Sequence, residues 1–136
     1  MVDYAKPTER PEIGVFYAFD HIRLWVGNAK QAASFYTTRM GFEYYAYQGL
    51  ETGSRDYCTH VVTNGKVCLA LTTPLNPGDS VFSKHLENHG DGVYDVAFHV
   101  DDAAGIYKKA VDRGAVSVCE PREFKDDNGS VILASV

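Results

Sequence analysis

A repeated pattern constrains the fold of this 136-residue chain most: a strand, a helix and a terminal glycine occur twice in the same order. Phe19–Val26 alternates polar and apolar side chains and predicts a strand. The residues after Asn28 carry apolar side chains at helical spacing up to Gly41. Val93–Val100 and the segment that ends at Gly114 repeat this order. The chain is therefore expected to contain two copies of one unit.

Equivalent positions in the two copies support the duplication. Aligning the two strands places Asp95 on His21 and Asp102 on Asn28. Asn and Asp are favoured N-cap residues because their side chains accept a hydrogen bond from the first helical turn. Each predicted helix thus begins after a capping residue.

The remaining elements of the first copy are predicted to be strands. Phe42–Gly49 is aromatic and Asn64-Gly65 separates Asp56–Thr63 from Lys66–Thr72, which predicts a β-hairpin. In the first of these strands, strict alternation predicts two faces, one with Phe42, Tyr44, Ala46 and Gln48 and the other with Glu43, Tyr45 and Tyr47.

The second copy is predicted to be shorter. A helix over 80–88, capped by Ser80, is expected to join the copies. After the second repeated helix we expect a strand at Val116–Glu120, a loop with Pro121, and a strand at Ser130–Val136. The pattern is β-α-β-β-β in the first copy and β-α-β-β in the second. A missing last strand would leave a free sheet edge, which would recruit another strand or make the fold marginal.

These elements predict an α+β fold with a mixed, mostly antiparallel sheet and helices outside it. Residues 1–15 are polar and are expected to form a mobile or loosely docked arm. Residues 16–136 are expected to form one domain of two units, at about 16–78 and 90–136.

Composition excludes several classes of function. The net charge is −5 and no basic cluster with aromatic residues occurs, which argues against nucleic-acid binding. No apolar run approaches the ~20 residues of a membrane span, and the first residues show no secretory signal. The odd set Cys58, Cys68 and Cys119 favours reduced thiols in a cytoplasmic protein, although Cys58 and Cys68 could pair across neighbouring strands.

Five stretches give a more specific resemblance. Paired β-α-β-β-β units are typical of the vicinal-oxygen-chelate (glyoxalase-like) superfamily. Within it, the chain resembles the N-terminal domain of the 4-hydroxyphenylpyruvate dioxygenase family at Trp25–Tyr36, Met40–Glu43, Gly49–Arg55, Leu75–Pro77 and His89–Val93. The resemblance covers nearly all of the chain beyond the arm.

This resemblance implies a role in tyrosine catabolism, where the family uses Fe(II) and O2 to convert 4-hydroxyphenylpyruvate into homogentisate. The family's iron ligands, two His and one Glu, lie in a C-terminal catalytic domain that would begin beyond Val136. No catalytic, cofactor or metal residue can therefore be carried over to this chain. The expected role is non-catalytic: packing against that domain and contact between subunits of a homo-oligomer.

His21 and Asp95 are the strongest candidates for a metal site, because superfamily ligands often lie near the start of each unit's first strand. Two ligands are too few to hold Fe(II) or zinc tightly. We expect the two side chains to form a polar pair instead.

Other reactive side chains carry weaker signals. His60 and His99 lie within predicted strands and are expected to be satisfied polar residues. Metal binding by His85 and His89, and a thiolate–imidazole pair of Cys58 and His60, are improbable because no motif surrounds them. The remaining candidates are four tyrosines that could line an aromatic cup or simply fill a core: Tyr44, Tyr45, Tyr47 and Tyr57.

Two alternatives to the non-catalytic role stay open. One is a stand-alone two-unit metalloenzyme, a glyoxalase-like lyase or extradiol dioxygenase, with metal at His21 and Asp95. The other is a metal-free ligand-binding module with an aromatic groove.

Overall fold

The computed structural model describes residues 12–78 and 80–136, and its internal contacts divide the chain into two compact units. One unit is Ala18–Phe98, and the other joins His99–Val136 to the residues up to Tyr17. Of the predicted N-terminal arm, residues 1–11 lie outside the described residues.

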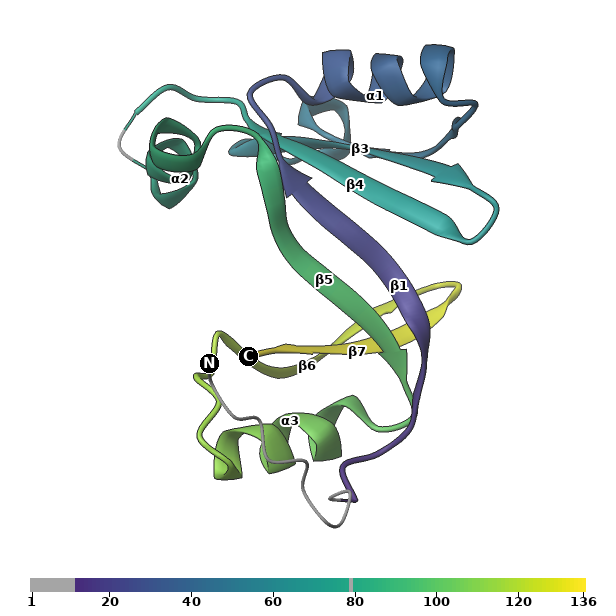
Figure 1. The fold of residues 1–136 in the computed structure, drawn as a ribbon, viewed down its shortest axis with the longest axis vertical. Coiled ribbons are helices and arrows are strands. Elements are labelled where there is room, and N and C mark those ends of the chain that lie inside the picture. Colours follow the sequence, from purple (N-terminus) through teal and green to yellow (C-terminus); the bar gives the residue numbers. More distant parts are fainter. Residues whose placement is uncertain (1–11, 79) are drawn as a thin grey trace, which may run out of the picture. The chain divides into compact units, whose positions relative to one another are not determined.

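The unit Ala18–Phe98 is built on a sheet with α1 on one face (Figure 1). The strand order is β2-β3-β4-β1-β5; β1 runs parallel to β4, and β3 runs antiparallel to β2 and β4. Its elements are β1 (Phe16–Trp25), α1 (Ala29–Arg39), β2 (Glu43–Gln48), a 3-10 turn (Leu50–Thr52), β3 (Tyr57–Asn64), β4 (Val67–Pro74), α2 (Val81–His89) and β5 (Gly92–Val100). The predicted hairpin is confirmed, but its turn lies one residue later, at Gly65-Lys66, because Asn64 still pairs with Val67.

The core of this unit lies between α1 and the sheet. Ala29 and Ala33 on α1 pack with Val26, Val62, Leu69 and Leu71, all of them buried. Small alanines let the helix approach the sheet closely, and the β-branched and Leu side chains of β3 and β4 fill the space beneath it.

The predicted helix boundaries follow from capping. The Asn28 and Asp102 side chains accept hydrogen bonds from the backbone N–H groups of Gln31 and Gly105, at 3.0 and 2.9 Å. Ser80 caps α2 in the same way, which places this helix one residue later than predicted. All three predicted N-caps are confirmed.

The other unit contains α3 (Ala103–Asp112) and a two-stranded sheet of β6 (Cys119–Asp126) and β7 (Gly129–Ser135). The prediction of a strand at Val116–Glu120 followed by a loop is wrong, because β6 runs through Pro121. The register shifts between Cys119 and Arg122, so a β-bulge surrounds this proline. A bulge tolerates proline because it interrupts the ladder of backbone hydrogen bonds.

The last residues of the predicted arm are held by this unit. The Val15 N–H donates to Asp101 Oδ1 at 2.9 Å, and the Asp101 N–H donates to the Val15 carbonyl at 3.1 Å. β1 accordingly begins at Phe16, earlier than the predicted start at Phe19.

The predicted fold class is confirmed: the chain is α+β with strand–helix–strand units and a mixed sheet. Among the described residues only two strands follow α3, whereas three follow α1. None of the helices in the described ranges is both long and apolar enough to cross a membrane.

Candidate functional site

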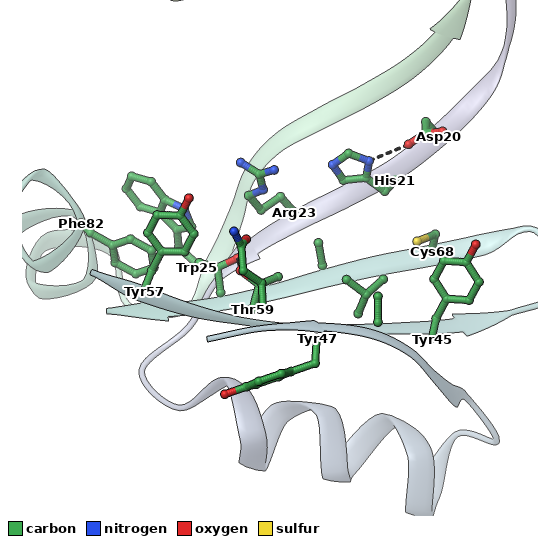
Figure 2. Close-up of a pocket in the computed structure, with 15 residues that line it drawn as sticks. Asp20, His21, Arg23, Trp25, Tyr45, Tyr47, Tyr57, Thr59, Cys68 and Phe82 are labelled. Atoms are coloured by element: carbon green, nitrogen blue, oxygen red, sulfur yellow. Dashed lines mark hydrogen bonds and ion pairs between the residues drawn. The ribbon is translucent and has the colours of Figure 1, made fainter. Parts of the chain in front are cut away.

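The face of the sheet turned away from α1 forms an open cup of about 560 Å³, entirely within the unit Ala18–Phe98 (Figure 2). Its floor consists of small or medium side chains and its rim of larger aromatic, charged and amide ones. The floor residues are Ala46, Thr59, Val61, Cys68, Ala70 and Thr72. The rim residues include Asp20, His21, Arg23, Trp25, Tyr45, Gln48, Tyr57 and Phe82.

Strand alternation brings the β1 side chains to this cup. His21, Arg23 and Trp25 line it, while Ile22 and Leu24 pack on the core beneath α1. The period of two predicted from the sequence therefore separates the core face from the cup face.

In β2 the predicted alternation is wrong beyond Tyr44. The register with β3 shifts between Tyr44 and Ala46, so one extra residue, Tyr45, interrupts the pairing. A bulge reverses the facing of the residues that follow it. Tyr47 then joins Tyr44 against His60, with ring centroids 4.9 and 6.1 Å from it, while Tyr45 lines the cup.

The four candidate tyrosines consequently divide between the two faces. Tyr45 and Tyr57 stand on the rim, whereas the ring of Tyr47 points toward α1 although the residue borders the cup (Figure 2). The Tyr47 hydroxyl donates to Glu51 Oε2 at 2.6 Å, and this bond raises the pKa of Tyr47 and lowers the pKa of Glu51. Of the two interpretations left open for these tyrosines, the cup holds for Tyr45 and Tyr57, while Tyr44 and Tyr47 are too exposed to fill a core.

His21 and Asp95 do not form the predicted polar pair. His21 Nδ1 lies 2.7 Å from Asp20 Oδ2, and Asp95 instead forms an ion pair with Arg23, with 3.5 Å between Nη1 and Oδ2. Aligning the two copies did not predict these partners, since each side chain finds a neighbour on its own or an adjacent strand.

The fit of a metal to this site is poor. Each of the two candidate ligands is engaged by another side chain, and within the described ranges no three His, Cys, Asp or Glu side chains converge as a metal site. Iron sites of the 2-His-1-carboxylate type need three such groups on one side of the ion. The residues of the cup thus do not fit Fe(II).

An aromatic stack that the sequence analysis did not predict closes one end of the cup. Trp25 is stacked with Phe82 at 4.1 Å and with Tyr94 at 3.5 Å between ring centroids, and His85 meets its edge at 5.1 Å. The stack holds α2 against β1 and β5. The signal in the sequence was weak, because these rings come from three separate elements.

The remaining histidines pack against other aromatic or imidazole rings. The ring of His85 lies 4.8 Å from that of His89 on α2, and His99 lies 5.3 Å from Tyr17. Burial, with a smaller effect of Lys30, lowers the pKa of His60.

The cysteines are free thiols. Cys68 lies on the floor of the cup, where burial and the nearby Asp20 raise its pKa. A raised pKa disfavours the thiolate and therefore nucleophilic chemistry at this cysteine.

Similar proteins show where this fold belongs. Residues 18–133 match the family described as the Glyoxalase/Bleomycin resistance protein/Dioxygenase superfamily. Among solved structures, a triple mutant of 4-hydroxymandelate synthase from Streptomyces coelicolor is similar with a TM-score of 0.80 and 28% identity, over 88% of this chain and 34% of that one. A methylmalonyl-CoA epimerase from Mycobacterium tuberculosis shares the fold, with a TM-score of 0.67 and 17% identity over 96% of this chain and 84% of that chain.

Curated relatives are more similar in sequence. The 4-hydroxyphenylpyruvate dioxygenase of Tetrahymena thermophila is 54% identical over 94% of this chain and 33% of its own length. Those of Xenopus tropicalis and Danio rerio are each 48% identical, over 98% and 100% of this chain and 34% of their own length. The chain thus spans about a third of the length of these relatives. It belongs to the glyoxalase/bleomycin resistance protein/dioxygenase superfamily and is homologous to 4-hydroxyphenylpyruvate dioxygenases.

Proposed function

We propose that this chain is the non-catalytic N-terminal domain of a 4-hydroxyphenylpyruvate dioxygenase. The whole protein would convert 4-hydroxyphenylpyruvate into homogentisate in tyrosine catabolism, with Fe(II) and O2 acting in a separate C-terminal domain. Sequence identity near 50% to relatives about three times as long supports this proposal. Free thiols agree with a cytoplasmic protein.

The observation that carries the non-catalytic role is the engagement of the two candidate ligands. His21 is bonded to Asp20 and Asp95 to Arg23, so neither side chain is available to a metal without losing its partner. This chain's own residues would therefore contribute structure and contacts, and the metal would supply oxidative chemistry elsewhere in the protein.

The proposed contacts are with the catalytic domain and with other subunits. Support comes from apolar side chains that stay about half exposed in the unit that contains β6 and β7. On these two strands they are Phe124, Val131, Ile132 and Leu133. Apolar surface of this kind is commonly covered by another domain or subunit.

Metal content and turnover test the proposal. We expect the purified 136-residue chain, supplied with Fe(II), ascorbate and 4-hydroxyphenylpyruvate, to form no homogentisate and to retain far less than one iron per chain after gel filtration. The longer gene product should form homogentisate and retain about one iron per chain. One iron per chain that is lost in a His21→Ala variant and retained in a matched His99→Ala variant would contradict the proposal.

The contact role needs its own test. Hydrogen exchange of the longer protein should be slower at β6 and β7 than in this chain, because the added domain or subunit covers them. Equal exchange rates in the two proteins would show that these strands form no such contact.

A further inference from the structure

We propose that the cup binds a flat aromatic carboxylate with one or two rings. This inference rests on the geometry of the cup and does not depend on the proposed function. The cup volume of about 560 Å³ falls in the range of small-molecule sites, roughly 300–1,000 Å³.

The shape of the cup favours a flat ligand. Its floor is made of small side chains, with Ala46 and Ala70 next to the Thr59–Thr72 hydroxyl pair, whose oxygens lie 2.9 Å apart. One of these hydroxyls donates to the other, so only the second O–H of the pair still needs an acceptor. A flat ring can therefore lie on the small side chains of the floor while this O–H donates to a ligand oxygen or to water.

The rim supplies aromatic contacts. Tyr45 and Tyr57 are 74% and 42% exposed, and neither ring packs on another ring within the described part of the chain. They stand at opposite ends of the floor (Figure 2). Tyr45 lies beside Val61 in the register, four residues along β3 from Tyr57, so about 13 Å separates them along the strand. That spacing admits one or two rings between them.

The charge of the rim favours an anion. Arg23 lines the cup and its guanidinium stands above the floor (Figure 2), with Nη1 3.5 Å from Asp95 Oδ2. The Arg23 side chain is 44% exposed, so its planar fork can turn toward a carboxylate, which guanidinium binds with two parallel hydrogen bonds. The one carboxylate that lines the cup, Asp20, is already bonded to His21.

The aromatic stack gives the cup a fixed end. Trp25 is held between Phe82 and Tyr94, so its indole forms a preorganised wall instead of a mobile side chain. A wall fixed before binding reduces the entropy that a ligand must offset.

Titration of the 15N-labelled chain with 2-naphthoate, followed by NMR, tests this site. We expect saturable shifts at the amides of the floor, led by Ala46, Thr59 and Ala70. The neutral 2-naphthylmethanol and the non-planar cyclohexanecarboxylate should each bind about tenfold more weakly or not at all. The first lacks the carboxylate and the second lacks the flat aromatic ring.

Variants locate the binding. Arg23→Gln should weaken 2-naphthoate about tenfold and Arg23→Lys less, whereas Arg39→Gln, which removes the same charge from α1, should change nothing. Ala46→Leu puts a larger side chain on the exposed part of the floor, on the edge strand β2, and should abolish binding, while Ala104→Leu on α3 should preserve it. Well-dispersed spectra of each variant show that it is folded.

Three results would overturn the proposal. They are the absence of shifts at the floor up to the solubility limit of 2-naphthoate, equal affinity of the parent chain and the folded Ala46→Leu variant, and equal affinity for the acid and its alcohol. The last result would show that the cup is only an apolar surface.

Discussion

The two copies of the strand–helix pattern differ in how far their side chains are buried. In the first copy, residues from α1, β3 and β4 form a buried core, and four consecutive residues of β4, Leu69–Thr72, are at most 8% exposed. In the second copy, no described residue reaches that degree of burial, although apolar side chains are just as frequent on α3, β6 and β7.

In the described part of the second copy, a helix and two strands form no buried core. β4 pairs with β3 on one side and with β1 on the other, so it joins the hairpin to the first strand of its unit. The described part of the second copy has no counterpart of β4, and the residues of its hairpin are exposed or only partly buried. Two-stranded hairpins are marginal by themselves for this reason.

The largest expected effect comes from truncating a leucine in each copy. Leu71→Ala should lower the free energy of unfolding by about 2–5 kcal/mol, since Leu71 is 0% exposed and its removal leaves a cavity. Leu133→Ala should cost below about 1 kcal/mol, because Leu133 is 51% exposed. Urea denaturation followed by circular dichroism measures both. Equal costs would mean that the second copy is covered in solution.

Breaking the aromatic stack should have the next largest effect. Trp25→Leu removes the contacts with Phe82 and Tyr94 and should cost about 1–3 kcal/mol. Phe124→Leu, at a half-exposed phenylalanine of the second copy, is the matched control and should cost under about 0.5 kcal/mol. Denaturation curves of the two variants compare them, and a control as costly as Trp25→Leu would argue against a stabilising stack.

Both copies have an N-cap side chain on their helix, so removing each cap shows how far each helix contributes to the stability of the whole chain. Asn28→Ala and Asp102→Ala should each destabilise their own helix by about 1 kcal/mol. We expect the first to lower global stability, because α1 covers the core, and the second to accelerate amide exchange within α3 alone. Asn28→Asp and Asp102→Asn keep a capping side chain and should restore both helices. Identical global effects of the two alanine variants would contradict the difference between the copies.

The smallest effect should be a pH dependence confined to the first copy. The pKa of His60 is lower in the folded chain than the value of about 6.5 expected in the unfolded chain. As the pH falls below about 6.5, the unfolded chain therefore takes up a proton at His60 before the folded chain does. Its contribution to stability is therefore present above pH 6.5 and declines as the pH falls toward the folded pKa. NMR titration of the His60 ring gives that pKa directly, and His60→Gln should flatten the decline. A measured His60 pKa equal to the unfolded value would show that His60 makes no pH-dependent contribution to stability.

Much of the fold could be predicted from local patterns. Asn28, Ser80 and Asp102 marked three helix starts because capping is a contact within one turn of the chain. Asn64-Gly65 marked the hairpin for the same reason. The strand at Cys119–Asp126 could not be predicted, because a bulge absorbs Pro121 and only the pairing with β7 reveals it.

The candidate site was less predictable. The strand pattern was enough to put His21, Arg23 and Trp25 on one face, since alternation is a property of the backbone. Three further features follow from the packing of distant segments: Asp95 meets Arg23 instead of His21, a bulge turns Tyr45 into the cup and Tyr47 away from it, and three aromatic rings stack. These facts depend on register and on contacts between residues far apart in the chain, which a local pattern does not encode.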